Sequence, residues 1–135
     1  MKKPISREMH GFTDYSYIPF AGYAPELIGF TENKTATILC KLLSAGILAS
    51  SLVTRAEWGF YKRMPYKTHL LLDTIGGITA LSAPFVFGFA NNKKARNTFF
   101  GLGAFGLLAG LLSEREEMPV TKEAFEETKD HLLAS

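Results

Sequence analysis

Long stretches of the chain are apolar, and the charged residues are grouped between them. Thr35–Thr54 contains one charged residue, Lys41, whereas Thr74–Asn92 and Asn97–Ser113 contain none. Spans of about 17–20 residues match a bilayer core of roughly 30 Å, at a rise of about 1.5 Å per residue. A soluble core helix of this length would carry a polar stripe, which Phe99–Leu112 lacks. The pattern therefore predicts transmembrane helices rather than a soluble helical bundle.

A second regularity is an internal repeat. Shifting the sequence by 59 residues aligns His10–Trp58 with His69–Glu117 without a gap, and 15 of the 49 aligned positions are identical. Each unit reads as a helix, a short polar turn and a second helix. Because each unit has two helices, the second unit enters the membrane in the same direction as the first. This predicts parallel repeats related by a pseudo-two-fold axis along the membrane normal.

The fold class follows from the repeat: an all-α membrane protein with four transmembrane helices, arranged as two tandem helical hairpins. His10–Phe30 alone would be a doubtful membrane helix, since it holds two prolines and two acids. Its partner His69–Phe89 is a good candidate, so the first segment is assigned by equivalence. The predicted divisions are a cytoplasmic segment 1–9, a transmembrane domain 10–117 (repeat 1 10–58, repeat 2 69–117) and a cytoplasmic tail 118–135, with an amphipathic helix over Thr121–Leu133.

The first helix of each unit carries a short motif: Ala-Pro, a further residue, and then Gly-Phe. It stands as Ala24-Pro25-Glu26 before Gly29-Phe30, and as Ala83-Pro84-Phe85 before Gly88-Phe89. The motif resembles the SPW-repeat proteins, small bacterial and archaeal membrane proteins with one or two such two-helix units. This chain departs from the Ser-Pro-Trp that the family name implies. The resemblance implies the architecture and a prokaryotic origin, and it assigns no catalytic residue.

Positive charge predicts the orientation in a bacterial plasma membrane. Seven Lys and Arg residues lie in the N-terminal segment and in the loop between the units, against four in the two polar turns. The first group is Lys2, Lys3, Arg7, Arg55, Lys62, Arg63 and Lys67; the second is Lys34, Lys93, Lys94 and Arg96. Since cytoplasmic loops are enriched in positive residues, both termini are expected in the cytoplasm.

The most distinctive candidate site is His-x3-Asp, which occurs as His10 with Asp14 and as His69 with Asp73. A spacing of four places each pair on one helical face. Nitrogen and carboxylate ligands suit zinc, iron or manganese, and buried ionisable groups could instead relay protons. A structural role is favoured, because each Asp lies near the positive end of its helix and can orient its own His. We expect both sets to face inward, without converging on a shared metal site.

The two units differ in charge at one place. Glu26 and Lys41 in unit one are replaced by Phe85 and Phe100 in unit two. At about 1.5 Å per residue, both charges lie at a similar depth on neighbouring antiparallel helices. We therefore predict an intramembrane ion pair between Glu26 and Lys41, and contact between the two phenylalanines. The alternative is that each charge snorkels alone to the headgroups.

Small residues and prolines suggest how the helices pack. Ala45-x3-Ala49 and Gly106-x3-Gly110 would allow close helix contacts, within the chain or between copies.

Pro25 and Pro84 are predicted to kink their helices, because each removes a backbone donor. The single Cys40 excludes an internal disulfide and any multi-cysteine metal site.

The sequence contains no nucleophile–base arrangement, phosphate-binding loop or zinc-protease helix. The net charge of +2 does not favour nucleic acid. These observations favour a non-catalytic membrane protein, a structural or interaction subunit with no catalytic residue and no cofactor. Its partners would be the lipid bilayer and either another membrane protein or a second copy. The alternative is an ion, proton or small-solute transporter using the paired His and Asp residues, and a metal-dependent membrane enzyme comes third.

Overall fold

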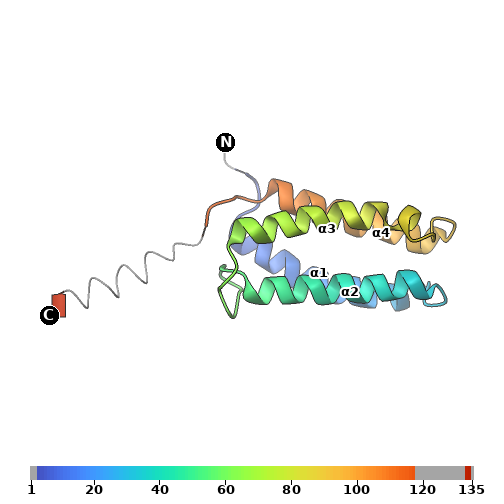
Figure 1. Cartoon of the computed structure of the whole chain (residues 1–135), viewed down its shortest axis with the longest axis horizontal. Helices are drawn as coiled ribbons and strands as arrows, with labels where there is room; N and C mark the ends of the chain where they lie inside the picture. The colour runs from blue at the N-terminus through green and yellow to red at the C-terminus, as the bar shows by residue number, and fades with distance from the viewer. Residues whose placement is uncertain (1–2, 118–132, 135) are drawn as a thin grey trace.

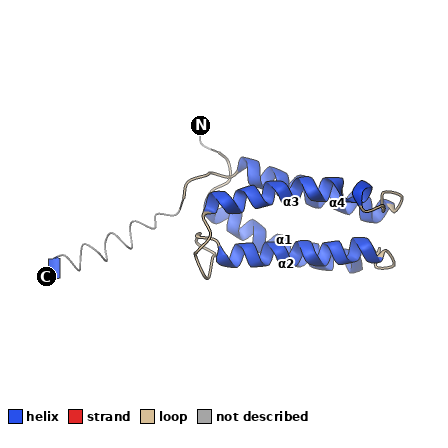
Figure 2. Ribbon diagram, in the orientation of Figure 1, coloured by secondary structure: helices blue, strands red, loops and turns tan. Residues whose placement is uncertain are grey.

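The described part of the chain forms four long helices that run along one axis (Figure 1). The structure is a computed structural model and describes residues 3–117 and 133–134. The helices are α1 (Arg7–Ile28), α2 (Lys34–Val53), α3 (Tyr66–Val86) and α4 (Lys93–Leu112). Within the described residues there is no β-strand (Figure 2). The predicted all-helical class is confirmed; the tail helix predicted over Thr121–Leu133 lies, apart from its last residue, outside the described residues.

The connections lie at two ends of the helices. The α1–α2 and α3–α4 turns are at one end, and the start of α1, the α2–α3 loop and the end of α4 are at the other (Figure 1). Helices α1 and α3 therefore run in the same direction. The closest packing is within each hairpin, α1 against α2 and α3 against α4, while α1 also contacts α4 and α2 contacts α3.

Three of the helices are long and apolar enough to cross a membrane: α2, α3 and α4. Helix α1 has a similar length of 22 residues, but it is not one of them. It contains more charged residues than the others, and it also holds Pro19 and Pro25. Three of the four helices predicted to span a membrane are thus long and apolar enough to do so, and α1 is not apolar enough.

Equivalent residues begin and end equivalent helices. The Asn33 side chain accepts a hydrogen bond from the backbone of Ala36 at 3.0 Å, and Asn92 accepts one from Ala95 at 3.1 Å. Both asparagines are N-caps, which satisfy backbone donors that have no partner inside the helix. Just beyond Pro25 and Pro84, the chain turns at glycines with φ of 92° and 77°, a left-handed conformation that glycine adopts at little cost.

Helices α1 and α3 begin three residues before the predicted His10 and His69. In α1, Ser6 caps the helix by accepting from the backbone of Met9 at 3.2 Å. In α3, the cap is a distant residue: the Glu117 carboxylate accepts from the backbone N–H of Tyr66 and of Lys67, each at 2.9 Å. Proximity in the sequence could not indicate this cap, because Glu117 follows α4.

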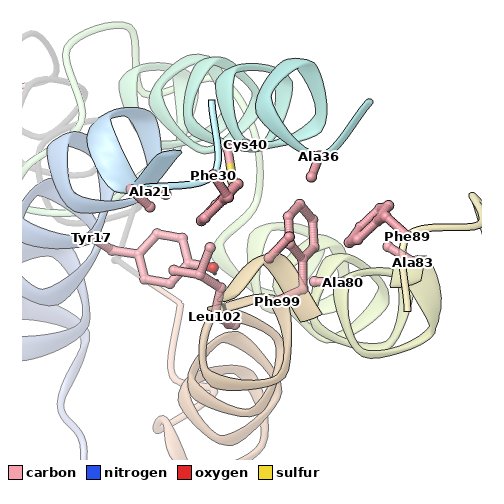
Figure 3. Close-up of a cluster of buried hydrophobic side chains, with 12 residues drawn as sticks. Tyr17, Ala21, Phe30, Ala36, Cys40, Ala80, Ala83, Phe89, Phe99 and Leu102 are labelled. Carbon is pink, nitrogen blue, oxygen red and sulfur yellow. Dashed lines mark hydrogen bonds between the residues drawn. The ribbon is translucent and has the colours of Figure 1, made fainter. Parts of the chain in front are cut away.

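The two hairpins meet in a core of aromatic and small side chains (Figure 3). The rings of Phe89 and Phe99 pack edge to face, with centroids 5.0 Å apart. The Tyr17 hydroxyl donates to the Leu102 carbonyl at 3.0 Å, which satisfies the one polar group of that ring. Buried alanines from all four helices belong to the same core: Ala21, Ala24, Ala36, Ala80, Ala83 and Ala95.

Glycines bring α3 and α4 close together. A Cβ atom on Gly103 would lie 2.7 Å from the Leu81 backbone nitrogen and 2.8 Å from the Gly77 carbonyl oxygen. A Cβ atom on Gly110 would lie 3.0 Å from the Leu70 carbonyl oxygen, and one on Gly106 would be 3.7 Å from the Gly77 Cα. The predicted packing role of Gly106 and Gly110 is confirmed.

The predicted packing role of Ala45 and Ala49 is wrong within this chain, because both residues are exposed. The face of α2 that contacts α1 passes through Ser44 instead, whose hydroxyl donates to the Ile18 carbonyl at 2.7 Å. Ser44 is the repeat equivalent of Gly103. Since neighbouring residues are about 100° apart around a helix, an error of one position moves a side chain off the contact face.

The predicted pair of charges is confirmed. The Lys41 ammonium nitrogen lies 2.7 and 2.9 Å from the two carboxylate oxygens of Glu26, and it also donates to the Gly22 carbonyl. At the matching place in the second hairpin, the Phe85 and Phe100 rings stack with centroids 5.9 Å apart. One position in the repeat is therefore filled by an ion pair in one copy and by an aromatic pair in the other.

The predicted kink positions are both buried. Pro25 and Pro84 lie inside α1 and α3, near their C-terminal ends. The backbone N–H groups of Gly29 and Phe30 both donate to the Pro25 carbonyl at 3.0 Å. The kinks themselves stay a prediction.

The glycine contact gives a test. Gly103→Ala should lower the free energy of unfolding by about 1–3 kcal/mol, because the methyl group meets backbone atoms that cannot move aside. Gly101→Ala, two residues along the same helix, meets nothing within 4 Å and should be neutral or slightly stabilising. Denaturation in detergent micelles, followed by circular dichroism, measures both. Equal effects of the two substitutions would contradict the packing described.

Candidate functional site

His10, Asp14, His69 and Asp73 meet between α1 and α3; we call these four residues the His–Asp cluster. One ligand atom from each residue lies within 4.8 Å of the others. At most 9% of any of the four side chains is exposed. The four-residue spacing places both side chains of a pair on one helix face, and in the structure that face is turned toward the other hairpin. The expectation that both sets face inward is confirmed.

Each histidine of the cluster makes its shortest contact with the Asp of the other repeat, and we call these two contacts exchanged. His10 Nε2 lies 2.7 Å from Asp73 Oδ2, and His69 Nε2 lies 2.7 Å from Asp14 Oδ2. The contacts within each pair are longer, 3.3 Å for His10 with Asp14 and 3.2 Å for His69 with Asp73. Each histidine thus has its own Asp within reach, as expected, but its shortest hydrogen bond joins the two hairpins.

The other nitrogen of each imidazole is held by a hydroxyl group. His10 Nδ1 lies 2.6 Å from Ser113 Oγ, and His69 Nδ1 lies 2.9 Å from Thr54 Oγ1. Thr54 and Ser113 are 59 residues apart, so they are equivalent positions of the repeat. Each follows the last residue of its helix, α2 or α4. All four helices therefore contribute to the position of the two rings.

The hydrogen-bond partners of the cluster determine which atoms carry protons. The Ser113 hydroxyl donates its proton to a carbonyl one turn earlier in α4 at 2.6 Å, and Thr54 likewise donates to the Ser50 carbonyl. Each hydroxyl must therefore accept from the imidazole, so both Nδ1 atoms carry a proton. A second proton lies between each Nε2 and the carboxylate oxygen at 2.7 Å. Each His–Asp pair is then electrically neutral, whichever atom holds that second proton.

The convergence of the four residues was not expected. We predicted that the two sets would not share a common point, and that prediction is wrong as to geometry. The spacing within each helix indicated a histidine oriented by its own Asp, because it contains no information about the other hairpin. The side chains of α1 and α3 reach across the centre of the bundle, and this brings the second set within hydrogen-bond distance.

Aromatic and hydroxyl groups surround the cluster. The Tyr66 ring stacks on His69 at a centroid distance of 6.3 Å and meets His10 edge to face at 5.8 Å. The Ser51 hydroxyl lies 3.4 Å from Asp14. The repeat equivalent of Ser51 is Gly110, so Asp73 has no hydroxyl group at the matching position. Sequence reasoning missed Ser51, Thr54, Tyr66 and Ser113, although their alignment with the repeat was a usable signal for Thr54 and Ser113.

An ion pair joins several segments at the end of the bundle where the cluster lies. The Arg7 guanidinium donates to both Glu57 carboxylate oxygens, at 2.6 to 3.1 Å, and to the Glu116 carbonyl at 2.8 Å. The hydrogen bond from Arg7 lowers the pKa of Glu57. One arginine thus joins the start of α1, the α2–α3 loop and the segment after α4. A small cavity of about 10 Å³, the size of one water molecule, lies between Arg7 and His69.

No family model, no curated protein and no solved structure matches the chain. The resemblance to the SPW-repeat proteins, and the prokaryotic origin that it implies, stay predictions.

The cluster predicts a strong effect of removing one charge. Asp73→Asn should destabilise the fold by about 3–5 kcal/mol, because the substitution leaves a buried histidine without its charged partner. Glu26→Gln also replaces a carboxylate in an ion pair, but that pair is half-exposed, so we expect little change. Unfolding in detergent micelles compares the two variants. If Asp73→Asn were as stable as Glu26→Gln, the cluster would not hold the hairpins together.

Proposed function

We propose that this protein is a small integral membrane protein that acts as a structural or interaction subunit of a membrane assembly. The observation that supports this function best is an outward-facing groove of about 940 Å³ between α1 and α4. Its lining is mostly apolar, with Phe12 and Phe20 on one side and Gly101 and Phe105 on the other. Gly101 leaves open space where a side chain would stand. A groove of this kind accepts the side chains of a neighbouring helix.

The proposed arrangement places all four helices across the bacterial plasma membrane. Helix α1, of 22 residues, would span about 33 Å, and His10 and Asp14 are buried inside the bundle rather than exposed. The start of α1, the α2–α3 loop and the end of α4 share one end of the bundle (Figure 1). That end carries Lys3, Arg7 and the positive residues of the loop, which supports a cytoplasmic location for both termini.

The repeat supports a pseudo-two-fold axis along the membrane normal. Helices α1 and α3 run in the same direction (Figure 1), and contacts recur at positions 59 residues apart. His10 with Ser113 matches His69 with Thr54. The backbone bridge of Ile5 with Ser113 likewise matches that of Met64 with Thr54. Superposition of the two halves is the corresponding geometric prediction.

The groove gives a direct test of the interaction role. Gly101→Leu fills the groove, so the protein should no longer migrate with its assembly when it is extracted in a gentle detergent, while its own helical content and melting temperature are unchanged. Gly46→Leu is the matched control, because Gly46 on α2 also meets nothing within 4 Å but does not line the groove. Native mass spectrometry of both variants and the unmodified protein measures the assembly. A wild-type protein that is monomeric in gentle detergent would contradict the proposal.

A second candidate function, ion or proton transport, is favoured by the His–Asp cluster alone. Buried ionisable groups inside membrane proteins are rare and commonly mark proton or ion pathways. Transport would require that protons enter and leave the cluster. In proteoliposomes, an imposed proton gradient should then dissipate through the wild-type protein and not through Asp14→Asn with Asp73→Asn. Equal leakage from empty liposomes and from wild-type proteoliposomes would exclude this candidate.

A further inference from the structure

The His–Asp cluster has the composition of a divalent metal site. Two imidazole nitrogens and two carboxylate oxygens face one another from α1 and α3, all within 4.8 Å. We propose that the cluster binds one divalent transition-metal ion of the zinc type, in exchange for two protons. This inference goes beyond the proposed interaction role, which does not require a metal.

Four of the six separations between the ligand atoms lie within 1 Å of those that a tetrahedral ion needs. Zinc bonds of about 2.0–2.1 Å in tetrahedral geometry separate neighbouring ligand atoms by about 3.4 Å. In the cluster, the two contacts within the pairs measure 3.3 and 3.2 Å. The two exchanged contacts measure 2.7 Å, so each must lengthen by less than 1 Å when an ion replaces the shared proton. The two remaining separations, between the nitrogens and between the oxygens, are at most 4.8 Å, so each must shorten by no more than about 1.4 Å.

The imidazole rings are already oriented for coordination. A histidine that binds a metal through one nitrogen commonly donates the N–H of its other nitrogen to a fixed acceptor. Ser113 and Thr54 are those acceptors, at 2.6 and 2.9 Å from Nδ1 of His10 and His69. Both Nε2 atoms therefore point at the carboxylates and need no change of tautomer after they lose a proton.

Charge balance favours the exchange of two protons for one ion. In the proton form, each of the two His–Asp pairs is neutral. When a divalent cation binds, each pair releases the proton between Nε2 and the carboxylate. The two imidazoles are then neutral, and the two negative carboxylates balance the two positive charges of the ion. The cluster is neutral before and after. A neutral site avoids the large desolvation cost of an uncompensated charge inside the protein.

The ligand set selects the type of metal and its role. Two nitrogens with two carboxylate oxygens suit zinc and related ions, whereas magnesium and calcium prefer oxygen ligands alone. Four protein ligands complete a tetrahedral site without an open position, which is typical of structural rather than catalytic zinc. The ion would therefore join α1 to α3, in place of the two exchanged hydrogen bonds.

Other titratable groups near the cluster are few. Arg7, Tyr15 and Tyr17 belong to α1 and Tyr66 to α3, while α2 and α4 contribute only hydroxyl groups. Arginine and tyrosine side chains both keep their protons between pH 6 and 8. The two protons released between pH 6 and 8 would then come from the cluster itself.

The test uses the full chain, purified in detergent and freed of metal by a chelator, with Zn²⁺ and Co²⁺ as probes. Calorimetry should show one Zn²⁺ per chain and two protons released, so the apparent affinity should rise about 100-fold per pH unit. Co²⁺ should give the visible absorption of a tetrahedral complex and be displaced by Zn²⁺, while Mg²⁺ should not compete. No binding, more than one ion per chain, or release of fewer than two protons would overturn the proposal.

Substitutions in the cluster test which residues bind the ion. Ser113→Ala should weaken Zn²⁺ binding by about 10–100-fold, because His10 loses the acceptor that orients it, and Asp14→Asn with Asp73→Asn should abolish binding. Glu26→Gln, a carboxylate outside the cluster, is the matched control and should bind as the wild type does. Unchanged affinity in Ser113→Ala would overturn the assignment of ligands. This measurement remains decisive if the double Asn variant does not fold.

Discussion

Four ionisable side chains lie buried where the two hairpins meet, and every other contact in the bundle must be compatible with their pairing. A buried imidazolium or carboxylate without a partner would cost several kcal/mol in an apolar interior. Asp14 and Asp73 each have their shortest contact with the histidine of the opposite hairpin, at 2.7 Å. The hairpins can therefore dock in one register only, since a displacement by one helical turn would separate both pairs at once.

This register requires small residues at the helix contacts. In the second hairpin, Gly77 and Gly103 let α3 and α4 approach until their backbones touch. In the first hairpin, Ser44 stands in place of Gly103 and donates to a carbonyl of α1. Glycine contributes only proximity, whereas serine adds a hydrogen bond across the helices. The two copies thus maintain similar geometry with different chemistry, as they also do with Glu26 and Lys41 against a pair of phenylalanines.

The cluster is also the point where structure and function could be coupled. It is neutral, it is held by hydroxyls from α2 and α4, and it lies at the same end of the bundle as the ion pair of Arg7 with Glu57. The groove between α1 and α4 is lined partly by Tyr17, which also lines the small cavity beside Asp14 and Asp73. Phe105 likewise lines both spaces, and its ring stacks on Tyr17 with centroids 5.5 Å apart.

The sequence by itself determined the helices, their order and the candidate residues. Hydropathy located three helices apolar enough to span a membrane, and the 59-residue repeat identified His10 and His69 as equivalent, because local patterns report helix faces and turns directly. Depth along two antiparallel helices was enough to pair Glu26 with Lys41. Only the tertiary structure decided which Asp each histidine binds, that Glu117 caps α3, and that Ala45 lies outside the helix contact. These depend on how the hairpins dock and how each helix is rotated about its axis, which spacing within one segment does not specify.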